Sequence, residues 1–428
     1  MDLGKKMISV EQALSLVKSN DHIVSALAPA EGAAFLGSLH TIADRVKNVT
    51  VTSCLPMGNF EYMTNRAYAD SFNVDGWFFT PALRKAMPNG NVSHVPQQLS
   101  TAALKRLCHL KCNIFIGNCS MPDKHGYVSL GLSNTYETYV MERADIVILE
   151  INPNVPRTFG DVFIPVDEVD YFIDADYAIP EIPDAPCNEK DLAIGKTIAE
   201  FINDGDTIQL GIGGIPNAVA ESLYGLKHLG VHTELYTTGM MKLTKAGVID
   251  NSRKTLHKGS AVTTMIIGTR ELYDFVDDNP GIMVMNGMYT NDAYVIGQND
   301  NQISINTTLE VDLTGQLQRE SGLGSVLGQR RTGGYRYRRA KEQKRKILHS
   351  ALFHGYGEKS RRYAHRGQQN SASIEARRDG DAQPKRRAVR CHRIRRGGFA
   401  RHKHKRESGK AHRRFSPQIQ RAAHQRGL

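Results

Sequence analysis

Residues 210–219 combine a run of glycines with a local pattern that binds anions. The sequence LGIGGIPNAV places Gly211, Gly213 and Gly214 between an apolar strand and the start of a helix. Backbone N–H groups and the helix dipole favour an anion at this position, such as a phosphate, a carboxylate or an oxyanion. A dinucleotide fingerprint would have glycine where Pro216 stands, and the lysine of a phosphate-binding loop is absent. A tight strand-to-helix turn explains the glycines equally well.

Glu234 is a carboxylate at or inside an apolar strand, in the sequence VHTELYTTG. If the sheet is parallel, this strand end opens on the same edge as the glycine loop. A desolvated carboxylate aimed at an electrophilic carbonyl can act as a nucleophile, and the resulting oxyanion needs fixed N–H donors. The alternative is a glutamate held in a salt bridge at a strand end. Taken alone, the pattern favours this alternative.

Two stretches of sequence, about half the chain apart, repeat one order of elements that would position these residues. Ser9 and Gln12 form a capping box for a helix within 9–20. The elements expected after it are a strand at 22–27, a loop at 28–32 and a helix at 33–39. The second stretch contains a helix over GKTIAEF, a strand at 207–210, the glycine loop and a helix opening at Pro216. When Asp21 is aligned with Asp206, the two predicted strands coincide, and the loop at 28–32 coincides with the glycine loop.

Further strands and one linker complete the expected architecture. A strand follows each repeat, at 47–58 and 229–240, and others are predicted at 112–116 and 145–151. The sequence DIVILEI in the last of these is apolar enough for a central strand covered on both faces. Six prolines crowd residues 153–186, which we interpret as a linker. The pattern predicts an α/β fold with two related domains and largely parallel sheets.

The chain consists of an acidic part followed by a strongly basic part. Residues 317–428 hold 32 lysines and arginines against 7 acidic residues, a net charge of +25, whereas residues 1–316 have a net charge of −14. This distribution excludes a uniformly basic DNA-binding protein. No apolar run reaches the roughly 18–20 residues of a membrane span, so we expect a cytoplasmic protein with no membrane partner. The six cysteines lack paired spacing, and we expect reduced thiols and no metal site.

Many long motifs in order resemble the acetyl-CoA hydrolase/transferase family, especially its butyrate and 4-hydroxybutyrate CoA-transferases. In the second half these include GKTIAEFINDGDTIQLGIGGIPNAV, HLGVHTELYTTG and INTTLEVDLTGQ. In the first half they include NVTVTSCLPMGNFEY, MPDKHGYVSLGLSN and NVPRTFGDVFIPVDEVD. The resemblance spans residues 1–316 almost end to end.

The resemblance implies a ping-pong CoA transfer with Glu234 in the family's nucleophile position. A glutamyl-CoA thioester would carry CoA from a short-chain acyl-CoA, of the butyryl or 4-hydroxybutyryl type, to an acceptor carboxylate such as acetate. Gly211, Gly213 and Gly214 would line the CoA or oxyanion pocket, with Asn217 nearby. Coenzyme A is a substrate, and no cofactor or metal is required. The resemblance favours a homo-oligomer, and His125 in PDKHGY matches the family pattern as a ligand contact or a packed loop residue.

Two other functions remain open from the sequence. In an acyl-CoA hydrolase, water would discharge the same glutamyl-CoA intermediate. In a nucleic-acid-binding protein, the basic C-terminal segment would bind backbone phosphates without sequence specificity. Its affinity for nucleic acid would fall steeply as the salt concentration rises. The second of these is remote, because the segment has few aromatic residues for stacking.

The resemblance stops immediately after Gln316. The family would continue with a second glycine loop and strands reading GKSFIALYSTA and YVVTEYG, and none of these is present. Reading the back-translated segment shifted by one base recovers them: QKRKILHSALFHGYGE, for example, can read KNGKSFIALYSTAMVK. We therefore interpret residues 317–428 as a frameshifted, largely disordered basic tail and expect this chain to show little or no CoA transfer. The predicted divisions are a CoA-transferase/hydrolase domain over 1–188, an incomplete second CoA-transferase domain over 189–316, and the tail over 317–428.

Overall fold

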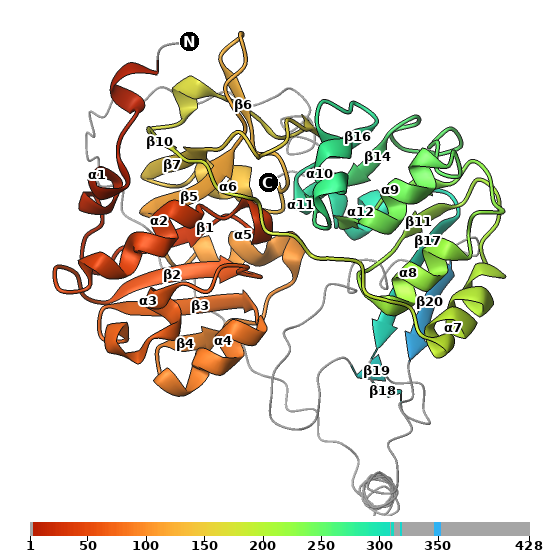
Figure 1. The fold of residues 1–428 in the computed structure, drawn as a ribbon, viewed down its shortest axis with the longest axis horizontal. Helices are drawn as coiled ribbons and strands as arrows, with labels where there is room; N and C mark the ends of the chain where they lie inside the picture. Colours follow the sequence, from red (N-terminus) through yellow and green to blue (C-terminus); the bar gives the residue numbers. More distant parts are fainter. Residues whose placement is uncertain (1–2, 309, 312–316, 319–345, 352–428) are drawn as a thin grey trace, which may run out of the picture. The chain divides into compact units, whose positions relative to one another are not determined.

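The computed structural model describes residues 3–308, 310–311, 317–318 and 346–351 of the 428-residue chain. By compactness the chain divides into two units, Met1–His354 and Gly355–Leu428, and the second unit lies outside the described residues. Within the described ranges, no helix is both long and apolar enough to cross a membrane. The predicted α/β class with largely parallel sheets is confirmed (Figure 1).

The first half is built on one seven-stranded sheet, in the order β10-β7-β5-β1-β2-β3-β4, with every neighbouring pair parallel. Its strands are β1 His22–Ser25, β2 Val49–Cys54, β3 Phe72–Phe78, β4 Val92–His94, β5 Ile114–Cys119, β7 Ile146–Ile151 and β10 Tyr171–Asp174. All six residues of β5 are buried, because parallel strands inside such a sheet are covered on both faces. The predicted apolar strand DIVILEI is β7, one position from the edge.

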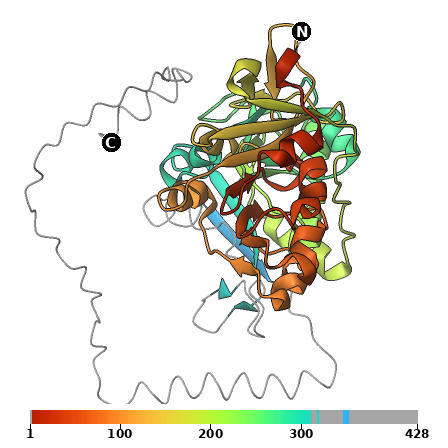
Figure 2. The same cartoon turned by 90° about the vertical axis from the view of Figure 1, so that its left-hand side faces the viewer.

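Short helices connect these strands in crossover fashion, as parallel pairing requires. The connecting helices are α2 Ala33–Ser38, α3 Glu61–Thr64, α4 Pro81–Ala86, α5 Ala102–Leu107 and α6 Glu137–Met141, whereas α1 Val10–Ser15 precedes β1. The predicted capping box is present: the Ser9 side chain accepts from the Gln12 amide, and the Gln12 side chain accepts from the Ser9 amide. In Figure 2 the red and orange helices of this half lie in a row beside the sheet.

The second half contains smaller parallel sheets. The largest has the order β12-β11-β17-β20, and two others have the orders β13-β15 and β14-β16-β8. Their strands are β8 Phe159–Gly160, β11 Thr207–Gln209, β12 Gly230–Val231, β13 Leu235–Tyr236, β14 Ala261–Thr263, β15 Met265–Ile266, β16 Ile282–Val284, β17 Gln302–Thr308 and β20 Lys346–Ala351. Two antiparallel pairs join β6 Tyr127–Ser129 to β9 Phe163–Pro165, and β18 Glu310–Val311 to β19 Leu317–Gln318.

The helices of the second half are α7 Glu189–Ala199, α8 Gly214–Glu221, α9 Thr238–Lys245, α10 Arg270–Val276, α11 Gly287–Thr290 and α12 Ala293–Ile296. Helices α7 and α8 pack closely, because a Cβ on Gly195 of α7 would lie 2.6 Å from the Ala218 backbone of α8. Figure 1 shows α8 beside β11 and β17.

The predicted linker at 153–186 is wrong for most of its length. It contains β8, β9 and β10, and β10 is the edge strand of the seven-stranded sheet. The prolines are compatible with this because they lie between the short strands or at a strand end, such as Pro165 at the end of β9. Only residues 175–188 run between the two halves without a strand or helix.

Two predicted boundaries near the glycine loop also need correction. Helix α8 begins at Gly214 rather than at Pro216, because Pro216 occupies the first turn, where its missing N–H costs no hydrogen bond. The strand predicted over 229–240 is broken into β12 and β13, and α9 has begun by Thr238. The Thr237 hydroxyl accepts a hydrogen bond from the Met240 amide and so caps α9.

Two short stretches of residues 317–428, the segment expected to be largely disordered, form strands. Residues 317–318 form β19, and Lys346–Ala351 form β20, which pairs in parallel with β17 over six residues. An uncovered sheet edge offers unpaired backbone N–H and C=O groups to almost any extended segment, so pairing there makes little demand on sequence. The other residues of this segment, including the HKHK cluster at 402–405, lie outside the described ranges.

Glu31 is a buried carboxylate in the loop that aligns with the glycine loop of the second half. Its side chain is 2 % exposed, and its Oε1 accepts hydrogen bonds from the amides of Gly58 at 2.6 Å and Met57 at 3.2 Å. Burial raises the pKa of Glu31 to about 8, and the nearby carboxylate of Glu150 adds to the rise. The loop that follows β2 is therefore held by a carboxyl group that is protonated at neutral pH.

We expect the free energy of unfolding to fall as pH rises from 4.5 to about 8, since the unfolded chain releases the Glu31 proton first. The slope from this group is at most about 1.4 kcal/mol per pH unit. Glu31→Gln should remove it, which urea unfolding at pH 5 and pH 8 would measure. The exposed Glu61→Gln is the matched control. An unchanged slope in the Glu31 variant would contradict the assignment.

Candidate active site

A cavity of about 510 Å³ brings both predicted features together. Glu234 lines it, as do Gly211, Gly213 and Asn217 from the glycine loop and α8. The side chains of Gln209 on β11 and Asn306 on β17 also face it, and Gln209 Oε1 accepts from Asn306 Nδ2 at 3.3 Å. The glycine loop and the strand end of Glu234 therefore open on one cavity, as the parallel-sheet argument predicts.

Glu234 lies between β12 and β13 and is 8 % exposed. Its Oε2 accepts a hydrogen bond from Nδ2 of Asn291 at 2.7 Å. Asn291, at the end of α11, is 6 % exposed. The amide donor fixes the orientation of the carboxylate and polarises it without neutralising its charge. A carboxylate held this way at a cavity wall can attack an electrophile that enters the cavity.

The backbone of Glu234 is fixed by hydrogen bonds from the next strand region. Its carbonyl oxygen accepts from the amides of Thr264 at 3.1 Å and Met265 at 3.0 Å, and from the Thr263 hydroxyl at 3.1 Å. The first half braces that region in turn, because the Asn134 amide donates to the Thr264 carbonyl at 2.9 Å. The motif SLGLSN of the first half thus supports the strand end that carries Glu234.

Asn291 is positioned by a buried histidine. Nε2 of His232 donates to the Thr290 carbonyl at 2.9 Å. Burial lowers the pKa of His232 to about 3, so the ring is neutral and Nε2 carries the proton. His232 lies two residues before Glu234, and Thr290 lies one residue before Asn291. The hydrogen bond therefore ties the two chain segments whose side chains meet at the Glu234 carboxylate.

The three glycines of the loop differ in backbone conformation and in what surrounds them. Gly213 has φ 124° and ψ −179°, a conformation essentially restricted to glycine. Gly211 lines the cavity, whereas Gly214 does not: a Cβ on Gly214 would lie 2.7 Å from Oδ2 of Asp191, on the side packed against α7. Asn217 lines the cavity and also donates from Nδ2 to the Ala185 carbonyl at 3.1 Å.

Gly213→Ala should strain the loop by roughly 1–3 kcal/mol, since an alanine at this φ and ψ is unfavourable. We expect a lower midpoint of thermal unfolding together with weaker binding of CoA, both measurable by differential scanning fluorimetry with and without CoA. Gly225→Ala is the matched control, because a Cβ there meets nothing within 4 Å and its φ is not positive. Equal behaviour of the two variants would contradict a special role for the Gly213 conformation.

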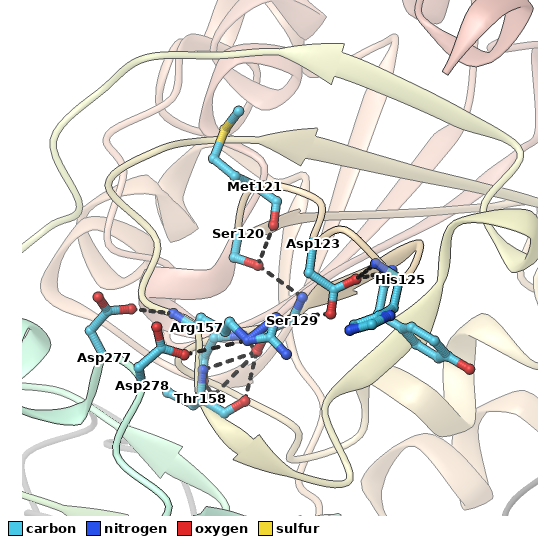
Figure 3. A network of polar contacts seen from close by, with 11 residues as sticks. Ser120, Met121, Asp123, His125, Ser129, Arg157, Thr158, Asp277 and Asp278 are labelled. Carbon is cyan, nitrogen blue, oxygen red and sulfur yellow. Dashed lines mark hydrogen bonds and ion pairs between the residues drawn. The ribbon is translucent and has the colours of Figure 1, made fainter. Parts of the chain in front are cut away.

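His125 lies outside this cavity, in a separate polar network (Figure 3). Its side chain is exposed, and its backbone amide donates to Oδ1 of Asp123 at 2.8 Å. The other oxygen of Asp123 accepts from Nη1 of Arg157 at 3.0 Å, and the Arg157 amide donates to Oδ1 of Asp277 at 2.7 Å. The network joins the loop before β6 and the segment before β8 to the loop after α10, so PDKHGY helps to hold the two halves together.

Asn291 and Arg84 are among the site residues that could not be identified from the sequence. Arg84 lines the cavity from α4 of the first half. Neither residue has a local sequence signal, because each meets the site through contacts with segments far along the chain. Asn306, which has no role by sequence alone, is also placed at the cavity.

Comparison with known protein families agrees with this geometry. Residues 2–183 match the acetyl-CoA hydrolase/transferase N-terminal domain, and residues 268–336 match the C-terminal domain of the same family. The second match continues to residue 336, which is 20 residues beyond Gln316, where the resemblance is expected to stop.

Characterised relatives cover most of the chain. The 4-hydroxybutyrate coenzyme A transferase of Clostridium kluyveri is 37% identical over 326 residues, which are 76% of each protein. The butyryl-CoA:acetate CoA-transferase of Anaerostipes caccae is 31% identical over 334 residues, 76% of this chain and 74% of the relative.

Two solved structures share the fold. A 4-hydroxybutyrate CoA-transferase from Porphyromonas gingivalis is 33% identical, with a TM-score of 0.64, covering 73% of this chain and 76% of that one. RipA from Yersinia pestis is 30% identical, with a TM-score of 0.72, covering 75% and 78%. The chain therefore belongs to the acetyl-CoA hydrolase/transferase family, as a CoA-transferase.

Proposed function

We propose that Glu234 is the nucleophile of a ping-pong CoA transfer. A carboxylate oxygen of Glu234 attacks the carbonyl carbon of an acyl-CoA thioester, the C–S bond breaks, and CoA leaves as the thiolate. The acyl group then forms an anhydride with Glu234. The thiolate attacks the glutamyl carbonyl and releases the acyl group as a free carboxylate, which leaves CoA bound to Glu234 as a thioester. The observation that supports this most is the oriented, nearly buried carboxylate at the cavity wall.

The second half-reaction reverses these steps with another acid. The acceptor carboxylate attacks the glutamyl carbonyl and displaces the CoA thiolate, and the thiolate then attacks the acceptor acyl carbonyl. This releases a new acyl-CoA and regenerates the Glu234 carboxylate. One thioester is exchanged for another at nearly equal free energy, so the balance of the reaction requires no ATP.

Each tetrahedral intermediate places negative charge on an oxygen that needs fixed donors. The amides of the loop through Gly211 and Gly213, with the N-terminus of α8 behind them, are suited to this task because they line the same cavity. We assign Asn217 to the CoA-binding wall, where its hydrogen bond to Ala185 holds the segment between the halves against α8.

Asn291→Ala should slow CoA transfer by about tenfold or more, because Glu234 loses an amide that orients and polarises it. Asn291→Asp should slow it further, since a second carboxylate beside Oε2 would repel the nucleophile and could not donate a hydrogen bond to it. Transfer from butyryl-CoA to acetate, catalysed by the frame-restored protein and its variants, provides the measurement. The exposed Asn203→Ala is the control. An unaltered rate in both Asn291 variants would exclude this role.

We further propose butyryl-CoA or 4-hydroxybutyryl-CoA as the acyl donor and acetate as an acceptor. The support comes from the relatives, whose names specify 4-hydroxybutyrate, and butyryl-CoA with acetate. Measuring release of free CoA from butyryl-CoA by the frame-restored protein, with and without acetate, separates transfer from hydrolysis. Acetyl-CoA formed with little free CoA supports transfer, and free CoA formed without acetate supports the hydrolase. A cytoplasmic location and a homo-oligomer remain predictions.

We also propose that residues 317–428 are encoded out of frame. The support is the change in net charge after Gln316 together with the long family motifs that a one-base shift recovers. Sequencing the gene across the codons for Thr314 to Glu320 tests this directly. A missing pair of bases relative to a frame that encodes the family motifs would support the proposal, and an unbroken gene with no such frame would exclude it.

A further inference from the structure

One wall of the cavity comes from the first half and takes no part in the chemistry proposed for Glu234. It consists of Leu55 after β2, Phe78 and Phe79 at the end of β3, and Thr80, Pro81 and Arg84 at the start of α4. Most of these side chains are apolar. Among the described residues that line the cavity, Arg84 is the one with a positive charge.

The guanidinium group of Arg84 is held in place but not neutralised by the part of the chain described. Its Nη1 donates to the Phe79 carbonyl at 3.0 Å, which anchors the side chain to the start of its own helix. None of the ion pairs between described residues includes Arg84. By contrast, Asp184, which lines another part of the cavity, is paired with Lys242 at 2.7 Å.

An ionised acceptor acid must enter a cavity that already contains the Glu234 carboxylate. Two carboxylates in one partly buried site repel each other, and a nearby cation offsets that repulsion. A guanidinium is suited to this because its planar donors match both oxygens of a carboxylate. Leu55 and Phe78 line the same cavity, and their apolar surface suits a short hydrocarbon chain better than a second polar group.

We propose that Arg84 binds the carboxylate group of the acceptor acid and so determines which acids are accepted: short monocarboxylates with an apolar chain. This inference rests on the proposed function of Glu234 and adds a substrate-binding residue to it. The phosphates of CoA are the other anions present during the reaction. They are separated from the reacting sulfur by the long pantetheine arm, whereas Arg84 and Glu234 line one cavity of about 510 Å³.

The test is equilibrium binding of butyrate to the full chain without CoA, measured by isothermal titration calorimetry. Arg84→Met should weaken butyrate binding by at least about tenfold, because a charged hydrogen-bonded pair is lost. Arg84→Lys should lie between Arg84→Met and the parent chain, since it keeps the charge but not the paired donors. Lys85→Met is the matched control, because Lys85 is exposed on the same helix and does not line the cavity.

Two further measurements distinguish binding of the acceptor carboxylate by Arg84 from binding of a CoA phosphate. Glu234→Gln should bind butyrate at least as tightly as the parent chain, because it removes the repelling charge, and this holds whether or not Glu234 is the nucleophile. Butyrate binding that is equal in Arg84→Met and the parent chain would overturn the proposal. A second result would also overturn it: Arg84→Met binds CoA more weakly, while its binding of pantetheine and of butyrate is unchanged. Arg84 would then bind a phosphate group of CoA. If Arg84→Met does not fold, Arg84→Gln provides the same comparison.

Discussion

Glu234→Gln is expected to abolish CoA transfer, with a loss of at least about a thousandfold in the frame-restored protein. Glutamine has the size of glutamate and can still accept the hydrogen bond from Asn291, so the local structure should persist. It cannot form the anhydride or the CoA thioester. The measurement is the rate of acetyl-CoA formation from butyryl-CoA and acetate.

The matched control for this variant is Glu271→Gln. Glu271 is a glutamate of the same half, and its exposed carboxylate pairs with Lys245 at 2.7 Å, away from the cavity. It should retain the parent rate, because an exposed ion pair contributes little to stability. Glu234→Ala adds a second test that does not depend on the shape of the side chain. Turnover that survives in both Glu234 variants would remove the nucleophile from the mechanism.

Restoring the reading frame after Gln316 should convert a chain with little or no CoA transfer into an active one. The restored segment would encode the second glycine loop of the family, whose amide donors can each stabilise an oxyanion by about 3 kcal/mol. Loss of even one such donor slows a reaction by roughly a hundredfold. The comparison is the specific activity of the two proteins, purified in the same way and assayed with butyryl-CoA and acetate.

Glu234→Gln in the restored protein is the control for that comparison, since any activity it retains comes from contaminating enzymes. Residues 1–316 are identical in the two proteins, so a difference between them isolates the segment after Gln316. If the chain as it stands transfers CoA at the same rate as the restored protein, the second glycine loop is dispensable and our interpretation of the segment is wrong.

The placement of Glu234 beside the glycine loop could be predicted from the sequence because both features are local. Each lies where an apolar strand ends, and parallel strands bring their carboxyl ends to one edge. Asn291 and Arg84 could not be predicted in this way. Asn291 reaches Glu234 across 57 residues of sequence, and Arg84 reaches the cavity from the other half of the chain. Such pairings depend on how the sheets pack, which periodicity does not encode.

The errors in the predicted elements have a common physical cause, which is tertiary structure acting on short segments. The proline-rich stretch 153–186 contributes β10 to the edge of a large sheet, although its composition is typical of a linker. Residues 229–240 are expected to form one apolar strand, but the chain bends after β12 and the Thr237 hydroxyl caps α9. The bend leaves Glu234 between two short strands, where its side chain meets the cavity.

The most direct test of the account is to look for CoA attached to Glu234. The frame-restored protein would be incubated with butyryl-CoA without an acceptor, digested rapidly at acidic pH, and analysed by mass spectrometry. We predict that the peptide containing Glu234 gains the mass of CoA less one water, that acetate removes this adduct, and that Glu234→Gln never acquires it. An adduct on another residue, or active protein with no adduct, would contradict the account.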